Sequence, residues 1–330
     1  MLDFNGILGL KSIKDHLQKA VIDGHPNHAY IFCGEEGTGR KSVAECFASA
    51  LCCEADDPKQ KPCGKCMACM QTASKTHPDI IHVTHEKSRI GVDDIRNSVL
   101  NDISIKPFSS NYKIYLINEA ERMTEQAQNA LLKTLEEPPA YAVIILITTN
   151  TGAFLQTILS RCVTLQFKPL PNKLIAEYLM EKEKLPDYYA HLCAAFSGGS
   201  LGQALKFAKN EDFEKIKNET LAFLRNVDSI STDDIFDMVL SLGTKKTDIN
   251  VYLDLMHLWF RDILMFKATQ DANRLVFLDE LMIIKKQASK YSFEALGKIL
   301  DGFYIVHDRL NANVNFDTAI ELFLLRMREH

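Results

Sequence analysis

A short apolar run at residues 29–33 leads directly into the glycine-rich segment Gly34-Glu35-Glu36-Gly37-Thr38-Gly39-Arg40-Lys41-Ser42. Apolar positions then continue at helical spacing over residues 43–51. A strand, a glycine loop and a helix in this order form a phosphate-binding unit, because the loop N–H groups and the helix N-terminus together attract phosphate. The segment therefore predicts a nucleotide-binding scaffold.

The loop lacks the two residues that perform the chemistry. In a working loop the last glycine is followed by lysine, which reaches the β- and γ-phosphates, and by a hydroxyl residue that holds Mg²⁺. Here Arg40 and Lys41 stand at these positions, and a lysine cannot ligate a cation. If Lys41 and Ser42 served as the pair instead, Arg40 and Glu35 would stand where glycines belong. We therefore expect no productive binding of ATP and Mg²⁺. The candidate residues of this degenerate site are Gly34, Gly37, Gly39, Arg40, Lys41 and Ser42.

A second nucleotide motif is also altered. Further strands are predicted at residues 80–83, 113–117 and 142–147, with helical stretches between them, which indicates a parallel α/β sheet. The strand at residues 113–117 ends in Asn118 and Glu119, where an ATPase carries an aspartate for Mg²⁺. A neutral amide is a poorer ligand for this ion than a carboxylate. Asn118 and Glu119 complete the candidate nucleotide site, and we expect no independent hydrolysis.

Four of the nine cysteines form a Cys-x9-Cys-x2-Cys-x2-Cys array: Cys53, Cys63, Cys66 and Cys69. Four thiolates can surround one tetrahedral Zn²⁺ at about 2.3 Å each, and no adjacent base suggests catalysis. We predict a structural zinc site in an insert at about residues 52–70, with Cys52 as an alternative first ligand. This cysteine usage suits a reducing cytoplasm better than a disulfide framework.

The 330 residues are enough for two or three domains. Strand patterns end after Pro169 and Pro171, and helical periodicity follows. We predict an α/β domain at residues 1–167, a small helical lid at 168–210 and a helical bundle at 211–330. The net charge of −5 marks no global nucleic-acid binder, and the longest apolar run, residues 142–147, is strand-sized, so we expect no membrane association.

Three further motifs carry a resemblance to a known family. They are the run Ala130-Leu131-Leu132-Lys133-Thr134-Leu135-Glu136-Glu137-Pro138-Pro139, the triplet Thr148-Thr149-Asn150, and the triplet Ser160-Arg161-Cys162. Together with the cysteine array they closely resemble the clamp-loader branch of the AAA+ family. The likeness is strong over about the first half of the chain. It is looser beyond, although residues 198–205 match the lid motif of the family.

The resemblance implies an AAA+-like module with a zinc knuckle, a small lid and a helical collar. It implies a clamp-loader subunit within a DNA-directed DNA polymerase complex, a nucleotidyltransferase assembly. The motor subunit of the family has an intact lysine–hydroxyl pair and an arginine at the lid position that Gly202 occupies here. This chain has neither, which favours a stator. The implied partners are ATP-hydrolysing motor subunits of gamma/tau type and the delta subunit, with the sliding clamp and primed DNA contacted mainly through the complex.

The resemblance also implies a role for Arg161, flanked by Ser160 and Cys162. In such complexes this arginine acts in trans, at the ATP site of the neighbouring motor subunit. A guanidinium is permanently charged and presents a planar fork of donors, which suits the γ-phosphate. From spacing alone, a surface arginine that pairs locally with a carboxylate is the alternative interpretation.

Two alternative functions stay open at this point. One is an active ATPase of the same family, in which Arg40 or Lys41 replaces the missing lysine and Glu119 is the base. The other is a small-molecule P-loop kinase. The kinase leaves the zinc array, the Ser-Arg-Cys triplet and the collar unexplained.

Overall fold

The computed structural model describes residues 3–83, 89–209, 211–227, 231–243, 249–312 and 314–328. The chain forms two compact units. One comprises Met1–Glu183 and Ser197–Ala204, and the other comprises Lys184–Phe196 and Leu205–His330. The chain passes between the units within the predicted lid region. The three-domain division expected from the sequence stays a prediction.

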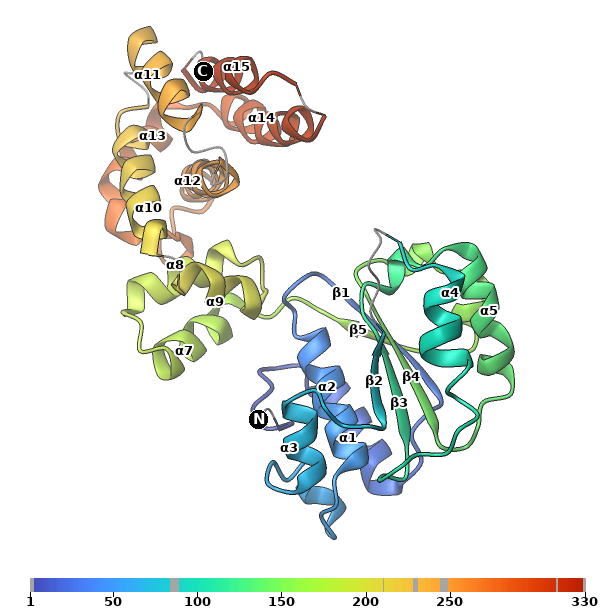
Figure 1. Cartoon of the computed structure of the whole chain (residues 1–330). Coiled ribbons are helices and arrows are strands. Elements are labelled where there is room, and N and C mark those ends of the chain that lie inside the picture. The colour runs from blue at the N-terminus through green and yellow to red at the C-terminus, as the bar shows by residue number, and fades with distance from the viewer. Residues whose placement is uncertain are drawn as a thin grey trace. The chain divides into compact units, whose positions relative to one another are not determined.

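The first unit contains a five-stranded parallel sheet (Figure 1). Its strands are β1 (Ala29–Gly34), β2 (Ile80–Val83), β3 (Lys113–Ile117), β4 (Ala142–Thr148) and β5 (Val163–Phe167), in the order β2-β3-β4-β1-β5. β1 lies between β4 and β5, with Phe32 opposite both Ile147 and Leu165. The carboxyl end of β1, where the glycine loop begins, therefore lies inside the sheet and not at its edge. The predicted parallel α/β class is confirmed.

Helices cover both faces of this sheet (Figure 1). One face carries α1 (Lys11–Asp23), α2 (Arg40–Cys52) and α3 (Met67–Ala73), and the other carries α4 (Val92–Ile95), α5 (Glu125–Glu136) and α6 (Gln156–Leu159). Side chains alternate along each strand, so that Tyr30 and Phe32 pack with α1 and α2 while Ile31 packs with α5. Burial on both faces explains why four strands read as nearly continuous apolar runs.

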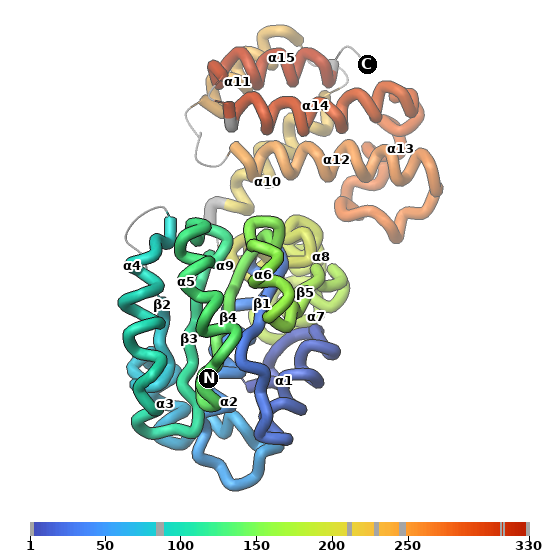
Figure 2. The backbone as a smooth tube through the Cα atoms, turned by 90° about the vertical axis from the view of Figure 1, so that its right-hand side faces the viewer, coloured from blue at the N-terminus to red at the C-terminus, as the bar shows by residue number. Residues whose placement is uncertain are grey.

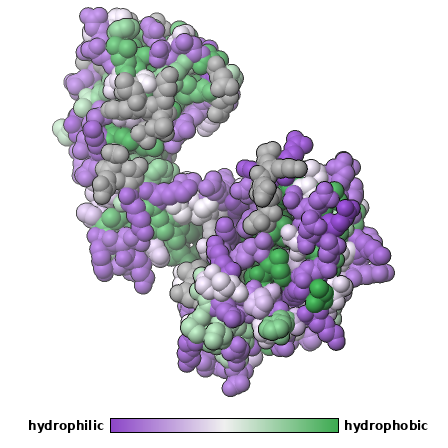
Figure 3. Space-filling model, viewed as in Figure 1, coloured by the Kyte–Doolittle hydropathy of each residue, from purple (hydrophilic) through white to green (hydrophobic). Residues whose placement is uncertain are grey.

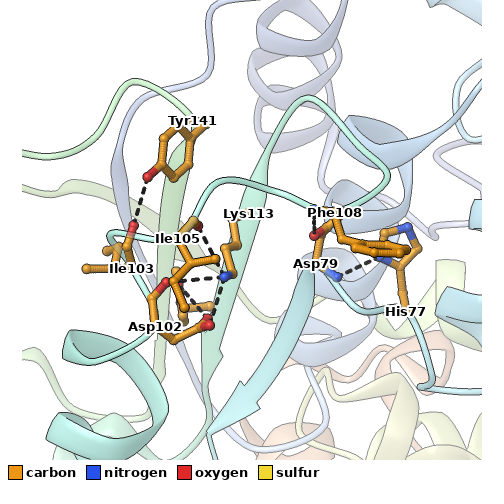
Figure 4. A network of polar contacts seen from close by, with 9 residues as sticks. His77, Asp79, Asp102, Ile103, Ile105, Phe108, Lys113 and Tyr141 are labelled. Carbon is orange, nitrogen blue, oxygen red and sulfur yellow. Dashed lines mark hydrogen bonds and ion pairs between the residues drawn. The ribbon is translucent and has the colours of Figure 1, made fainter.

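The loop before β3 is held from two sides by polar side chains (Figure 4). On one side, the buried Lys113 contacts Asp102 Oδ1 at 2.8 Å and the carbonyl of Ile105 at 3.3 Å through its Nζ. On the other side, the buried carboxylate of Asp79 accepts backbone N–H groups from Phe108 at 2.5 Å and Ser109 at 2.8 Å. Asp79, about 30 positions earlier in the sequence, and Lys113, which follows the loop, therefore both hold the loop in place.

Asp79→Asn is expected to lower the free energy of unfolding by about 3 kcal/mol, because an amide presents donors to groups that are themselves donors. Burial raises the pKa of Asp79, but hydrogen bonds from Phe108, Ser109 and Ser110 outweigh it, and the pKa is lowered. A lowered folded pKa stabilises the fold above the unfolded pKa of about 4, and this contribution is lost as the pH falls through the folded pKa.

Urea unfolding of the wild type and the variant between pH 7 and pH 3 measures this effect. The stability difference between the two proteins should shrink as the pH falls. Asp93→Asn is the matched control, because Asp93 is exposed and pairs with Arg96 at 3.2 Å. Its expected cost is below about 0.5 kcal/mol. A difference that does not change with pH would contradict the assignment to the Asp79 carboxylate.

The first unit also includes α7 (Asn172–Lys182) and the segment Ser197–Ala204, which contains the start of α9 (Leu201–Lys209). This segment turns through Gly198 and Gly199, both at positive φ. The Gly199 carbonyl accepts the N–H of Leu170 at 2.8 Å, which ties the segment to the chain that follows β5.

The described residues of the second unit form helices and their connections, with no strand among them. It contains α8 (Asp187–Phe196), α10 (Glu211–Leu224), α11 (Thr232–Gly243), α12 (Ile249–Thr269), α13 (Leu281–Lys290), α14 (Phe293–Asn311) and α15 (Phe316–Arg328). The long helix α12 packs against α10, α13 and α14 (Figure 2). Trp259 on α12 is fully buried and donates from Nε1 to Gln287 Oε1 at 2.8 Å. The expected all-helical C-terminal region is confirmed.

Most of the visible surface of both units is hydrophilic (Figure 3). Large apolar side chains that do reach the surface include Phe108 and Met282. Among the described residues, the helices are all too short or too polar to traverse a lipid bilayer.

Candidate functional site

The glycine loop has the backbone of a phosphate loop. Gly37 and Gly39 adopt φ values of 77° and 91°, a left-handed region that favours glycine. A Cβ on Gly34 would lie 2.5 Å from the carbonyl oxygen of Phe167 on the neighbouring strand. The loop closes where Thr38 Oγ1 donates to the Glu35 carbonyl at 2.7 Å. All three glycines are therefore explained by local geometry, whether or not a nucleotide binds.

The segment Ser197–Ala204, part of the predicted lid, contacts this loop directly. The Gly202 N–H donates to the carbonyl oxygen of Gly37 at 3.0 Å. A Cβ on Gly202 would lie 3.0 Å from Gly37 Cα, and a Cβ on Gly37 would lie 2.2 Å from Ser200 Oγ. Two backbones approach this closely only because neither residue has a side chain. The loop is therefore packed against the chain's own lid.

Arg40 begins α2 at the end of the loop and is partly buried. Burial lowers the pKa of its guanidinium, an effect that the negative charge of Glu121 opposes. Glu121 Oε1 accepts a hydrogen bond from Thr149 Oγ1 at 2.8 Å. Burial raises the pKa of Glu121, but hydrogen bonds from its own backbone and from Thr149 outweigh it, and the pKa is lowered. An ionised carboxylate therefore accompanies the loop arginine.

Glu121 was not a predicted site residue, whereas Glu119 was. Glu119 has a left-handed backbone with φ 52°, and its Oε2 pairs with Arg122 Nε at 2.9 Å. This ion pair engages the carboxylate that the alternative ATPase mechanism needs as a base. The sequence feature that could have indicated Glu121 is its place as the second acidic residue, after Glu119, in the segment that follows β3. Among the other candidates, Asn118 is half-buried while Lys41 and Ser42 are exposed.

The four cysteines of the predicted array come together in space. The Sγ atoms of Cys53, Cys63, Cys66 and Cys69 all lie within 4.8 Å of one another. The Cys63–Cys69 and Cys53–Cys66 Sγ pairs are each 4.0 Å apart. A tetrahedral Zn²⁺ with 2.3 Å bonds requires sulfur–sulfur distances of about 3.8 Å, so the four thiols fit such an ion.

Local backbone geometry organises this cluster. Cys66 is the N-cap of α3, and its Sγ accepts the N–H of Cys69 at 3.4 Å. Cys53 Sγ accepts the N–H of Cys63 at 3.4 Å. A hydrogen bond from the Lys65 backbone lowers the pKa of Cys63 to about 6, which favours the thiolate that a metal requires, whereas burial raises the pKa of Cys69 to about 12.

Cys52 lies outside the cluster. Its Sγ donates to Ser110 Oγ at 3.5 Å, and burial raises its pKa to about 12. Of the two alternative first ligands, the geometry selects Cys53. Cys33, Cys46 and Cys193, which the sequence indicated as core residues, are buried.

Arg161 follows α6 and keeps one third of its side chain exposed. Its Nη2 pairs with Glu136 Oε1 at 2.7 Å, and its Nη1 donates to the Thr157 carbonyl at 3.0 Å and to Ser160 Oγ at 3.3 Å. Burial raises the pKa of the Cys162 thiol to about 12, and Cys162 packs against the core beneath α5. Of the triplet, only Arg161 presents a charge, while Ser160 orients it and Cys162 anchors it.

The predicted residues therefore form three separate groups. The loop lies between β1 and α2, the thiols lie around the start of α3, and Arg161 is held by α5 and α6. Arg161 comes from different elements than the loop. Its local pairing with the Glu136 carboxylate matches the alternative interpretation from the sequence, and its role at another chain's nucleotide stays a prediction.

Comparison with known proteins identifies the family. A family profile described as "DNA polymerase III, delta subunit" matches residues 9–171, and one described as its C-terminal part matches residues 211–329. The delta-prime subunit of Bacillus subtilis DNA polymerase III is 28% identical over 306 residues, which cover 92% of this chain and 91% of that protein. This chain belongs to the delta-prime family of DNA polymerase III clamp-loader subunits.

Subunits named gamma and tau are also similar to this chain. The gamma subunit of Buchnera aphidicola (strain Bp) is 30% identical over 305 residues, covering 88% of this chain and 80% of that protein. The tau subunit of B. subtilis is 31% identical over 291 residues, and the chain spans half the length of that longer protein. The clamp-loader resemblance predicted from the motifs is confirmed, and the small-molecule kinase is excluded.

Proposed function

We propose that this clamp-loader subunit acts as a stator, which hydrolyses no nucleotide itself and presents Arg161 to the ATP site of a neighbouring motor subunit. The contact of Gly202 with Gly37 supports the proposal, because the loop backbone packs against another segment of the same chain and the Gly37 carbonyl already accepts a hydrogen bond. The loop also offers arginine and lysine where lysine and a hydroxyl residue are needed.

The geometry of Arg161 supports the second half of the proposal. A finger must project a fork of donors that a second chain can reach. Arg161 is partly exposed, and its bonds to Thr157 and Ser160 fix its direction from a short helix. These bonds keep the guanidinium partly exposed at the end of α6 in the free subunit.

The partners follow from the relatives. Because the relatives are named as tau, gamma and delta-prime subunits, we propose that the motor subunits of gamma/tau type and the delta subunit surround this chain. The sliding clamp and primed DNA would be contacted mainly through the complex, in the cytoplasm. The four cysteines would hold one structural Zn²⁺, which supplies a crosslink and no catalysis.

The purified chain alone is expected to show no turnover of Mg²⁺-ATP, because its loop lacks the lysine–hydroxyl pair and contacts its own lid. Phosphate release and binding of a fluorescent ATP analogue measure this. Glu119→Gln should leave the signal unchanged. Turnover that Glu119→Gln abolishes would instead establish an active ATPase of the same family.

A further inference from the structure

The Arg161 guanidinium already has three acceptors within its own chain. A guanidinium carries five N–H donors. Nη1 uses two of them on the Thr157 carbonyl and Ser160 Oγ, and Nη2 uses one on Glu136 Oε1. Both ends of the fork that would face a phosphate are therefore engaged in the free subunit.

The location of these acceptors makes the position favourable for a cation. Glu136 is the last residue of α5, and Thr157 lies in the one-turn helix α6. The C-terminal end of a helix carries partial negative charge, and a carboxylate there is unfavourable unless a cation compensates it. Arg161 provides that cation at 2.7 Å from the Glu136 carboxylate.

Glu136 and a γ-phosphate would compete for the same donors. A bidentate contact with phosphate needs both Nη atoms in one plane facing the ligand. Nη2 cannot present its full set of donors to phosphate while it pairs with Glu136. We infer that Glu136 is a positioning residue that holds the Arg161 finger in a resting orientation, from which the nucleotide of the neighbouring subunit must displace it. This inference rests on the proposed function of Arg161.

The size of the effect follows from exposure. Glu136 is 49% exposed and Arg161 is 33% exposed, so solvent screens the pair. Pairs of this kind contribute about 0.2–1 kcal/mol, which corresponds to about a 1.4- to 5-fold change in a rate or affinity. Glu136 would therefore act as a weak restraint that a bound nucleotide overcomes.

The test uses the reconstituted clamp loader with Glu136→Gln, which removes the charge and keeps the side-chain shape. The kcat/KM for ATP at the one site that Arg161 serves should rise by about 1.4- to 5-fold, because the finger no longer has to leave an ion pair. Raising the salt concentration should narrow the difference from the wild type, because the pair is screened. The matched control is Glu137→Gln, at the exposed C-cap position of α5, which should leave kcat/KM unchanged.

The outcomes separate this inference from the proposed function. In an Arg161→Ala background, Glu136→Gln should have no effect, because the group on which Glu136 acts is gone. A fall in kcat/KM, or no change, in the single variant would overturn the inference, since the carboxylate would then align the finger or leave it unaffected. If Arg161→Ala itself leaves kcat/KM unchanged, the proposed function fails instead.

Discussion

Arg161→Ala is expected to slow ATP hydrolysis by about 10³-fold at the motor-subunit site that Arg161 serves. The charge that develops on the transferred phosphoryl group would lose a preorganised guanidinium. If the ring has several nucleotide sites, the total rate of ATP hydrolysis should fall only by the fraction that this one site contributes. Single-turnover phosphate release from the reconstituted loader, together with clamp loading on primed DNA, measures the effect.

Two comparisons make the Arg161 result specific. Arg161→Lys should recover little of the loss, because an ammonium is a point charge without the planar fork. Arg96→Ala is the matched control, since Arg96 is also a surface arginine in an ion pair, with Asp93 at 3.2 Å. Equal rates for Arg161→Ala and Arg96→Ala would contradict a role in trans.

Removal of the metal is the second large effect that we expect. The native chain should contain one zinc per molecule, and a strong chelator or the double change Cys63→Ser and Cys66→Ser should release it. In small zinc peptides, binding of a structural zinc contributes on the order of 10 kcal/mol to the free energy of folding. We expect about half of that here, because α2 and α3 hold part of the insert in place without metal. Metal analysis and thermal unfolding provide the measurements.

Cys52→Ser is the control for the zinc prediction. Cys52 precedes the first ligand directly but bonds to Ser110 instead of joining the thiol cluster. The variant should therefore keep its zinc. If zinc is lost from Cys52→Ser and kept by Cys53→Ser, the ligand assignment is wrong.

Local patterns were enough to predict much of the α/β unit. β1, β3 and β4 are buried apolar runs, β2 is a mostly apolar edge strand, and the glycine loop follows β1 as expected. The sequence analysis did not include β5, whose side chains alternate between polar and apolar. The alternation in residues 163–167 is a strand signal, but it is short and lies close to two prolines.

Contacts between distant residues could not be predicted in the same way. The turn before β2 was expected, but nothing local indicates that Asp79 bonds to a loop 30 residues later. The pairing of Glu136 with Arg161 likewise depends on how α5 and α6 lie on the sheet. The sequence analysis chose Glu119 and not Glu121 as a site residue. The left-handed backbone of Glu119 and its ion pair with Arg122 cannot be predicted from the residue types alone.

The contact between Gly37 and Gly202 bears on how loop motifs are recognised in other chains. A glycine in such a motif is ordinarily taken as a sign that phosphate approaches the backbone. Here the partner that approaches is another segment of the same polypeptide, and a Cβ at either position would be crowded by it. Glycine spacing can therefore outlast the ligand for which it arose, because the fold has come to depend on it. A motif search that scores glycines without the residues after them will count such chains as nucleotide-binding proteins.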